Sequence, residues 1–367
     1  MSLDFDSARL ANPHFTEEHD AWRGALRRFI DTEIMPFADE WDEAGAIPSE
    51  LWPKAAEVGL LGLGYPEQFG GTSADSWHSW IVNEELSRVG VGGISASLMV
   101  HGIGLPPVIN WGPEWMQAEV APPVLSGEKW ISLGITEPGG GSDVANLSTT
   151  AVRDGDHFVV SGSKTYITGG MRANWVSTAV RTGGSGAGGV SMLLIPTDAE
   201  GFSRTPLDRK MGWWASDTAT LYFDEVRVPV ANLIGAENEG FRVIMTNFNS
   251  ERMGMAAAME AYGRVCLEEA VAWATERKTF GKRLADHQVI RHKIAQMKQQ
   301  LNATQAYIRL CYESIEAGTP NPGDIALLKV QASEVMEFCA REAMQILGGL
   351  GYMRGNRVER IYREVRV

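Results

Sequence analysis

The sequence predicts an α+β protein of three consecutive parts, because three textures follow one another along its 367 residues. Residues 1–128 read as amphipathic helices, residues 129–233 as short strands bounded by turns, and residues 234–367 as long helices. Short strands without intervening helices favour an antiparallel barrel or sandwich over a doubly wound sheet. We therefore expect an N-terminal all-helical domain, a middle antiparallel β domain and a C-terminal bundle of the four-helix type.

The N-terminal part carries clear helix signals. Thr16 can cap a helix that has two glutamates in its first turn, where negative charge interacts favourably with the helix dipole. Apolar residues then repeat at a helical period over residues 22–30. A second helix can begin at Ser49 and stop at Gly59, and residues 76–89 are again amphipathic.

The middle part begins with a predicted hairpin. Residues 149–153 and 157–161 alternate like strands around Asp154-Gly155, which is a strong tight-turn signal. Three further segments are rich in β-branched and aromatic residues and are bounded by turns, namely residues 175–181, 190–196 and 220–228.

The C-terminal part predicts long antiparallel helices. Residues 240–278 contain no proline, and a continuous helix over them would span about 57 Å at roughly 1.5 Å per residue. Residues 288–317 and 324–347 follow, separated by two prolines. Helices of this length joined by short loops are typical of a bundle.

Composition excludes several classes of function. A formal net charge of −13 argues against nucleic-acid binding, which needs a basic surface, and no apolar run is as long as a membrane span. The acidic N-terminus is unlike a transit peptide. The three cysteines (Cys266, Cys311 and Cys339) lack metal-ligand spacing. We expect reduced core thiols, no metal site and a cytoplasmic protein.

Two glycine-rich clusters flank the predicted hairpin and would lie at the same end of the sheet. The first is Leu133–Asp143 (LGITEPGGGSD) and the second is Gly162–Gly170 (GSKTYITGG). Consecutive glycines let backbone N–H groups approach a flat or anionic ligand, and Thr136, Ser142 and Thr168 offer hydroxyls. Either cluster alone reads equally well as an ordinary loop. Together, at this spacing, they indicate a ligand site.

These motifs resemble a known family. Thr-Glu-Pro-x-x-Gly-Ser-Asp, followed by Gly-x-Lys-x-aromatic-Ile-Thr after a hairpin, resembles the flavin-binding middle domain of the acyl-CoA dehydrogenase family, and the likeness extends along nearly the whole chain. The resemblance implies FAD, with Thr136 at the pyrimidine edge of the flavin, Tyr166 over one ring face and Thr168 at the hydride-accepting nitrogen. The family usually has tryptophan where this chain has Tyr166. The implied FAD-binding residues of this part are Leu133, Ile135, Thr136, Gly141, Ser142, Tyr166, Ile167 and Thr168.

A second set of implied FAD contacts lies in the C-terminal part. Residues 276–281 and Gln288 match the family segment that reaches an FAD bound to the neighbouring subunit, and residues 345–352 match a second family signature. The residues concerned are Arg277, Thr279, Phe280, Gln288, Gln345, Gly348 and Gly349. Taken alone, Arg277 reads as a solvated charge at a helix end, although its planar fork suits a pyrophosphate. The resemblance implies an obligate homo-oligomer, with a tetramer as the family habit. No Gly-x-Gly-x-x-Gly stands between a strand and a helix, so nicotinamide binding by a Rossmann fold is not expected.

The resemblance also implies the chemistry. A glutamate removes the α-proton of an acyl-CoA thioester, hydride leaves the β-carbon for flavin, and an electron-transferring flavoprotein receives the electrons. We place the base at Glu251, immediately before Arg252, as in the long-chain and isovaleryl-CoA branches of the family. Burial beside the substrate would raise the pKa of such a carboxylate. Ser142, Asn249 and Arg252 match positions that contact the acyl-CoA.

Alternatives remain open at this stage. The base can instead lie beyond Val367, where other branches of the family place it, and Glu364 is a third candidate that we expect to pair with nearby arginines. Glu137 and Asp143 are interpreted as local partners of the backbone. A flavin-dependent oxidase or monooxygenase of the same fold and a non-catalytic scaffold are the alternative functions.

Overall fold

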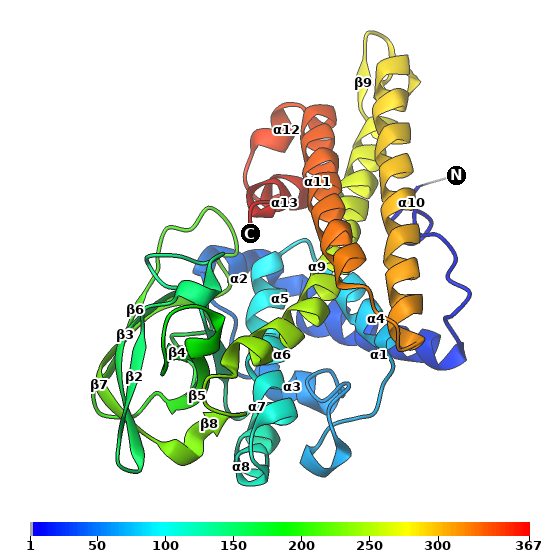
Figure 1. Cartoon of the computed structure of the whole chain (residues 1–367). Helices are drawn as coiled ribbons and strands as arrows, with labels where there is room; N and C mark the ends of the chain where they lie inside the picture. Colours follow the sequence, from blue (N-terminus) through cyan, green and yellow to red (C-terminus); the bar gives the residue numbers. More distant parts are fainter. Residues whose placement is uncertain (1–2) are drawn as a thin grey trace.

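The computed structural model describes residues 3–367 and confirms the expected fold class, with helices, then a sheet, then long helices (Figure 1). Thr16 is the N-cap of the first helix, as predicted, and its hydroxyl lies 2.9 Å from Nδ1 of His19. Gly59 follows α3 with a φ of 83°, a left-handed conformation that glycine adopts readily. The helices of this part are α1 (Glu17–Glu33), α2 (Ala38–Ala44), α3 (Leu51–Glu57), α4 (Ser76–Ser87), α5 (Gly92–Leu98), α6 (His101–Gly104), α7 (Pro106–Trp111) and α8 (Glu114–Leu125).

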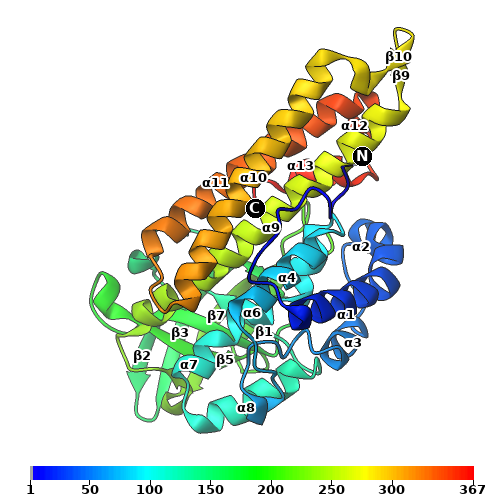
Figure 2. The ribbon, with the colours of Figure 1, turned by 90° about the vertical axis from the view of Figure 1, so that its right-hand side faces the viewer.

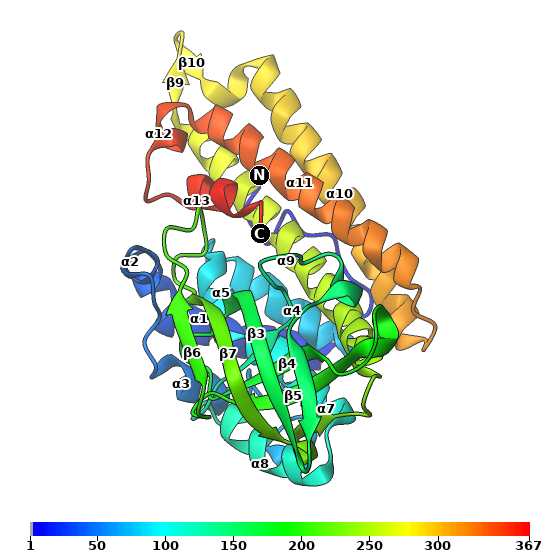
Figure 3. The ribbon, with the colours of Figure 1, turned by 60° about the vertical axis from the view of Figure 1, so that its left-hand side comes forward.

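The middle part is an eight-stranded sheet with the strand order β6-β7-β3-β2-β4-β5-β8, and β1 pairs with β4 outside this path. The predicted hairpin is confirmed: β2 and β3 pair around Gly155, which has a φ of 64°. Figure 3 shows this sheet face on, beneath the long helices. Its strands are β1 (Ile131–Gly134), β2 (Thr150–Asp154), β3 (His157–Thr168), β4 (Trp175–Arg181), β5 (Val190–Pro196), β6 (Phe202–Pro206), β7 (Thr218–Pro229) and β8 (Leu233–Ile234).

Two strand pairings depart from the antiparallel sheet that the sequence predicts. β1 runs parallel to β4, with Ile131 opposite Trp175, and β2 meets β4 through the parallel pair Thr150 and Arg181. The whole β2–β3 hairpin separates β1 from β4 in sequence, so the chain has room to return and run in the same direction. The residue pattern carries no sign of this, because side chains alternate in both kinds of strand.

The C-terminal part contains three long helices and two short ones. α9 runs unbroken from Gly240 to Glu276, as predicted, and packs against α4, α10 and α11 (Figure 2). A side chain at Gly263 would place its Cβ 2.6 Å from Leu301, so glycine allows α9 and α10 to approach closely. The helices are α9 (Gly240–Glu276), α10 (Gln288–Glu316), α11 (Pro322–Leu347), α12 (Gly349–Tyr352) and α13 (Arg357–Glu364), and a small hairpin of β9 (Lys278–Thr279) and β10 (Lys282–Arg283) joins α9 to α10.

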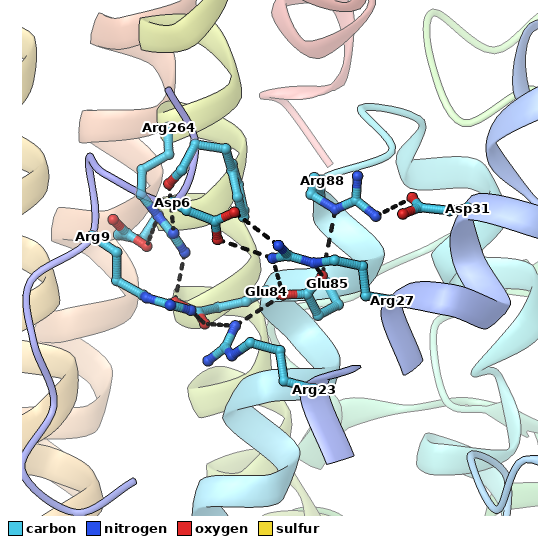
Figure 4. A network of polar contacts seen from close by, with 11 residues as sticks. Asp6, Arg9, Arg23, Arg27, Asp31, Glu84, Glu85, Arg88 and Arg264 are labelled. Carbon is cyan, nitrogen blue, oxygen red and sulfur yellow. Dashed lines mark hydrogen bonds and ion pairs between the residues drawn. The ribbon is translucent and has the colours of Figure 1, made fainter. Parts of the chain in front are cut away.

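A buried network of charges joins the N-terminal helices to the bundle (Figure 4). Glu84 of α4 accepts a hydrogen bond from Arg264 of α9 at 2.6 Å and pairs with Arg23 of α1 at 2.7 Å. Its neighbour Glu85 pairs with Arg23 at 2.9 Å and with Arg27 at 2.7 Å. These carboxylates therefore fix how α1, α4 and α9 lie against one another.

The three cysteines are buried free thiols, which agrees with the expectation of core residues. Within residues 3–367, no single helix is both long and apolar enough to cross a membrane, although α5 and the stretch His101–Trp111 satisfy length and composition together across a bend of 51°.

Candidate active site

The two glycine-rich clusters lie against each other and are joined by direct hydrogen bonds. The backbone N–H of Thr165 donates to the carbonyl of Thr136 at 2.9 Å. The ammonium group of Lys164 donates to the carbonyl of Ile135 at 3.1 Å and to Glu137 Oε1 at 2.8 Å. The loop after β1 is therefore held on β3 on both sides of Thr136.

Glu137 lies at the centre of this arrangement. Its carboxylate accepts hydrogen bonds from the backbone N–H groups of Ser148 and Thr149, which confirms the interpretation of a local backbone partner. Burial alone would raise the pKa of Glu137, but the charge of Lys164 and hydrogen bonds from Lys164, Ser148 and Thr149 outweigh burial and lower the pKa to about 2. Burial lowers the pKa of Lys164 to about 8 in spite of Glu137, so both groups are charged at pH 7.

Tyr166 projects from β3 at an irregular point of the strand. The register between β3 and β7 shifts between Lys164 and Ile167, and Tyr166 has a φ of 59°, which a non-glycine residue rarely adopts. A bulge of this kind turns a side chain away from the regular alternation. The side chain of Tyr166 is accordingly 70% exposed, whereas Lys164, Thr165 and Ile167 are buried.

The residues around Tyr166 fit a flat ligand with a polar edge. Within residues 3–367, the half-buried hydroxyls of Thr136 and Thr168 have no hydrogen-bond partner, so both are available to a ligand. A Cβ added at Gly139 or Gly140 would meet nothing within 4 Å, which leaves the outer face of the loop open. The other predicted residues here are half-buried (Leu133 and Ile135), exposed (Gly141 and Ser142) or buried (Ile167). An exposed aromatic ring beside unpartnered hydroxyls matches what an isoalloxazine requires.

The second predicted set of cofactor residues gathers where α9, α10 and α11 begin or end. Arg277 is the C-cap residue of α9, and its guanidinium lies 6.0 Å from the centre of the Trp273 ring. Phe280 forms the turn between β9 and β10 and is 96% exposed. The hydroxyl of Thr279 lies 3.2 Å from His287 Nε2. The remaining members are Gln288 at the start of α10, the exposed Gln345 and Gly348 at the end of α11, and the exposed Gly349 at the start of α12.

One chain does not bring these two sets together. The β9–β10 hairpin lies at the tip of the bundle, and the sheet lies at the opposite end of the molecule (Figures 1 and 3). The strand β3, which carries Tyr166, and the hairpin that follows Arg277 therefore lie at opposite ends of the molecule.

Glu251 lies on α9 and is half-buried. Its Oε1 accepts a hydrogen bond from Nδ2 of Asn247, one helical turn earlier, at 2.5 Å. Burial raises the pKa of Glu251 to about 7, although the charge of Arg252 acts in the opposite direction. The guanidinium of Arg252 instead bonds Oδ1 of Asn249 at 3.2 Å and covers the ring of Phe248. Glu251 and Arg252 therefore do not form the solvated surface pair that such a dipeptide usually indicates.

A cavity of about 280 Å³ lies between α7 and α9, beside Asn247. Its lining is mixed, with polar groups on both helices and apolar groups mainly on α7. The lining residues are Pro106, Pro107, Asn110, Trp111, Val243, Thr246, Asn247 and Ser250.

The expectation for Glu364 was wrong. Its buried carboxylate accepts hydrogen bonds from the backbone N–H groups of Gly92 at 2.9 Å and Trp213 at 3.2 Å, not from arginine side chains. The neighbouring Arg363 bonds Glu359 and the carbonyl of Met211. Burial raises the pKa of Glu364 to about 7. The carboxylate joins α13 to the first residue of α5 and to the loop before β7.

Among the described residues, one cluster has metal-ligand chemistry, formed by His19, Asp75 and His78. The backbone N–H of Thr16 donates to Nδ1 of His19, so Nε2 carries the proton of the neutral ring and donates to Asp75. Nε2 therefore has no free lone pair for a metal ion. The arrangement ties the start of α1 to the N-cap of α4.

Two residues with a place in these sites were missed in the sequence. Lys164 shares its side of β3 with the buried Phe158 and Val160, so strand alternation already placed it inside, where a lysine requires a carboxylate partner. Asn247 stands four residues before Glu251, a helical spacing at which side chains meet. Both signals were present in the sequence, but neither identified the residue with which Lys164 or Asn247 would interact.

Comparison with known proteins shows the family. Models of the N-terminal, middle and C-terminal domains of acyl-CoA dehydrogenase match residues 16–128, 132–226 and 238–367. The mitochondrial long-chain specific acyl-CoA dehydrogenase of Sus scrofa is 34% identical, over 96% of this chain and 83% of its own length.

Solved structures give the same result. A probable acyl-CoA dehydrogenase from Mycobacterium abscessus is 46% identical with a TM-score of 0.93, over 96% of this chain and 94% of that one. A glutaryl-CoA dehydrogenase from Mycobacterium smegmatis, solved in complex with FADH2, is 26% identical with a TM-score of 0.90, over 96% and 90%. The chain belongs to the acyl-CoA dehydrogenase family of FAD-dependent oxidoreductases.

Proposed function

We propose that this protein catalyses the α,β-dehydrogenation of an acyl-CoA thioester and that Glu251 is the base. The supporting observation is a half-buried carboxylate on α9 with a pKa raised to about 7. The resemblance to the long-chain and isovaleryl-CoA branches of the family implies the base at this same position. A base with a pKa near the working pH is both ionised and strong enough to accept a proton from a weakly acidic C–H bond.

The residues around Tyr166 are proposed to hold the flavin. Tyr166 would cover one face of the ring, and the unpartnered hydroxyls of Thr136 and Thr168 would bond its polar edge. The bonds from Lys164 and Thr165 keep the loop around Thr136 in place before any ligand arrives. When bound, FAD would supply the acceptor for the hydride that leaves the β-carbon.

The acyl-CoA is proposed to lie along α9. Arg252 bonds Asn249 and, within the described residues, no carboxylate, so its charge is available to a phosphate group of coenzyme A. Ser142 is exposed on the loop after β1 and can contact the same ligand.

The assembly is proposed to be a homotetramer in which two chains complete each FAD site. The separation of the two residue sets supports this, because Arg277 and Gln345 would serve an FAD held by the sheet of another chain. Large apolar side chains are exposed at the same end of the bundle, including Phe280 at 96%, Val289 at 61% and Tyr352 at 86%.

An electron-transferring flavoprotein is the proposed electron acceptor. The cytoplasm is the proposed compartment.

The central test is the variant Glu251→Gln. It should keep its yellow flavin, because the residue does not belong to either cofactor set, and anaerobic flavin bleaching by acyl-CoA thioesters should slow by roughly 10²-fold or more. The matched control is Glu364→Gln, which removes a second buried carboxylate with a pKa of about 7 and should leave bleaching near the parent rate.

If Glu251→Gln bleached at the parent rate, a residue other than Glu251 would be the base. If Glu364→Gln lost bleaching, Glu364 would be identified as the base. Steady oxygen consumption without an added electron acceptor would favour the oxidase alternative.

The shared site is tested by Arg277→Ala, which should lose FAD and weaken the oligomer. Arg283→Ala is the control, because Arg283 lies on the hairpin that follows Arg277 but is exposed and paired with Asp286. Flavin content by absorbance and mass by sedimentation are the measurements. Unchanged flavin content in Arg277→Ala would contradict a site completed by a second chain.

A further inference from the structure

Among the described residues, the base of the proposed reaction has one side-chain hydrogen-bond partner, Asn247. Asn247 is 8% exposed and lies one turn before Glu251 on α9. Its Nδ2 donates to two acceptors, the carboxylate of Glu251 at 2.5 Å and the backbone carbonyl of Ile103 in α6 at 3.2 Å. The amide therefore connects the carboxylate to a second helix.

The carbonyl of Ile103 fixes which way the amide points. A carbonyl oxygen only accepts hydrogen bonds, so the NH2 end of Asn247 must face Ile103, and the oxygen end cannot. The same NH2 group has a second hydrogen, which it presents to Glu251. The partner of Glu251 is thus a donor, which bonds the ionised carboxylate.

Neighbouring polar side chains do not share this role. The hydroxyl of Thr246 donates to the carbonyl of Val243 at 2.8 Å, and the hydroxyl of Ser250 donates to the carbonyl of Asn247 at 2.8 Å. Arg252 is the charged group that acts on Glu251 among the described residues, and it does so without a hydrogen bond.

We propose that Asn247 is a positioning residue, which anchors Oε1 of Glu251 to α6 and leaves Oε2 free to take the proton of the substrate. This inference rests on the proposed role of Glu251 as the base. Because the anchor point is a backbone atom of α6, the carboxylate is oriented by the N-terminal helices as well as by its own helix. The bond also favours the ionised form that a base needs, against the effect of burial.

The test replaces the donor in two ways. Asn247→Leu removes it, and Asn247→Asp is nearly isosteric, so that packing is kept while the donor becomes a like-charged acceptor. Loss of one hydrogen bond to the ionised carboxylate should raise the pKa of Glu251 by about 1–2 units in the first variant and by more in the second. Ser250→Ala is the matched control on the same wall of the cavity and should leave the pKa unchanged.

Two measurements on the flavin-loaded enzyme read this shift. Infrared difference spectra across a pH series follow the protonated carboxyl of Glu251, assigned by its absence in Glu251→Gln. The pH profile of anaerobic bleaching by acyl-CoA should move upward by the same amount, with the rate recovering at high pH. A merely structural residue would lower the rate at every pH.

An unshifted infrared pKa in Asn247→Asp would overturn the proposal. Should Glu251→Gln bleach normally, the role of Glu251 as base fails, and with it any role for Asn247 in proton transfer. The infrared shift would in that case still report the contact, so the two failures are distinguishable.

Discussion

Glu137 is buried and Glu251 is half-buried, and the pKa values of these two carboxylates move in opposite directions. Glu137, under the loops of the sheet, is held by Lys164 and by donors from Ser148 and Thr149, and its pKa falls to about 2. Within the part of the chain that the structure describes, Glu251 on α9 accepts from one donor, the amide of Asn247, and its pKa rises to about 7.

The difference teaches that the number and charge of donors, and not burial alone, decide what a buried carboxylate can do. A carboxylate surrounded by donors is a fixed anion that holds backbone in place. A carboxylate with one neutral donor keeps the ability to accept a proton near neutral pH. The enzyme uses both kinds, one to shape the loops around Thr136 and one for the proposed chemistry.

The largest expected effect comes from removing the positively charged partner of Glu137, the carboxylate surrounded by donors. Lys164→Met leaves the buried carboxylate of Glu137 without a positively charged partner. Breaking a buried ion pair in this way costs about 3–5 kcal/mol of stability. The free energy of unfolding in denaturant should drop accordingly, and flavin should be lost as the loop around Thr136 loosens. The double variant Lys164→Met/Glu137→Gln should recover most of the stability, because no uncompensated charge remains. Equal losses in the single and double variants would contradict an ionised pair.

A smaller expected effect is the pH dependence of folding stability, to which Glu251 and Glu137 contribute with opposite signs. Between pH 4.5 and about 7, unfolded chains have released the proton of Glu251 while the folded protein retains it, so this group reduces stability as pH rises through that window. Glu137 behaves oppositely, with its stabilisation complete above pH 4.5 and lost as pH falls toward about 2.

Glu251→Gln should therefore raise the melting temperature by a few degrees relative to the parent at pH 8, and much less at pH 5. Thermal unfolding of both proteins at the two pH values is the measurement. The same difference at both pH values would show that the pKa of Glu251 is not raised.

Much of the fold was predictable because the signals are local. The turn at Gly155, the cap at Thr16 and the uninterrupted α9 each follow from neighbouring residues, and the structure confirms them. The parallel pairing of β1 with β4 was not predictable, since it depends on contacts between strands that are far apart in sequence.

The candidate site likewise has a part that local sequence motifs predicted and a part that depends on long-range contacts. The motif around Thr136 and the glutamate before Arg252 could be read directly, and their roles stay predictions. The partners of buried charges could not be read, because Lys164 finds Glu137 across 27 positions and Glu364 finds Gly92 across 272. A residue pattern indicates that a charged side chain is buried, but the tertiary fold determines which residue pairs with it.

The ion network between α1, α4 and α9 has a consequence for how such chains diverge. Replacing one partner leaves the other charge stranded away from water, whereas joint replacement by apolar residues of similar volume is often neutral or stabilising. Positions such as Glu84, Arg23 and Arg264 should therefore change together across relatives, in compensating sets. A relative in which Glu84 alone has changed should place its first helices on the bundle at a different angle.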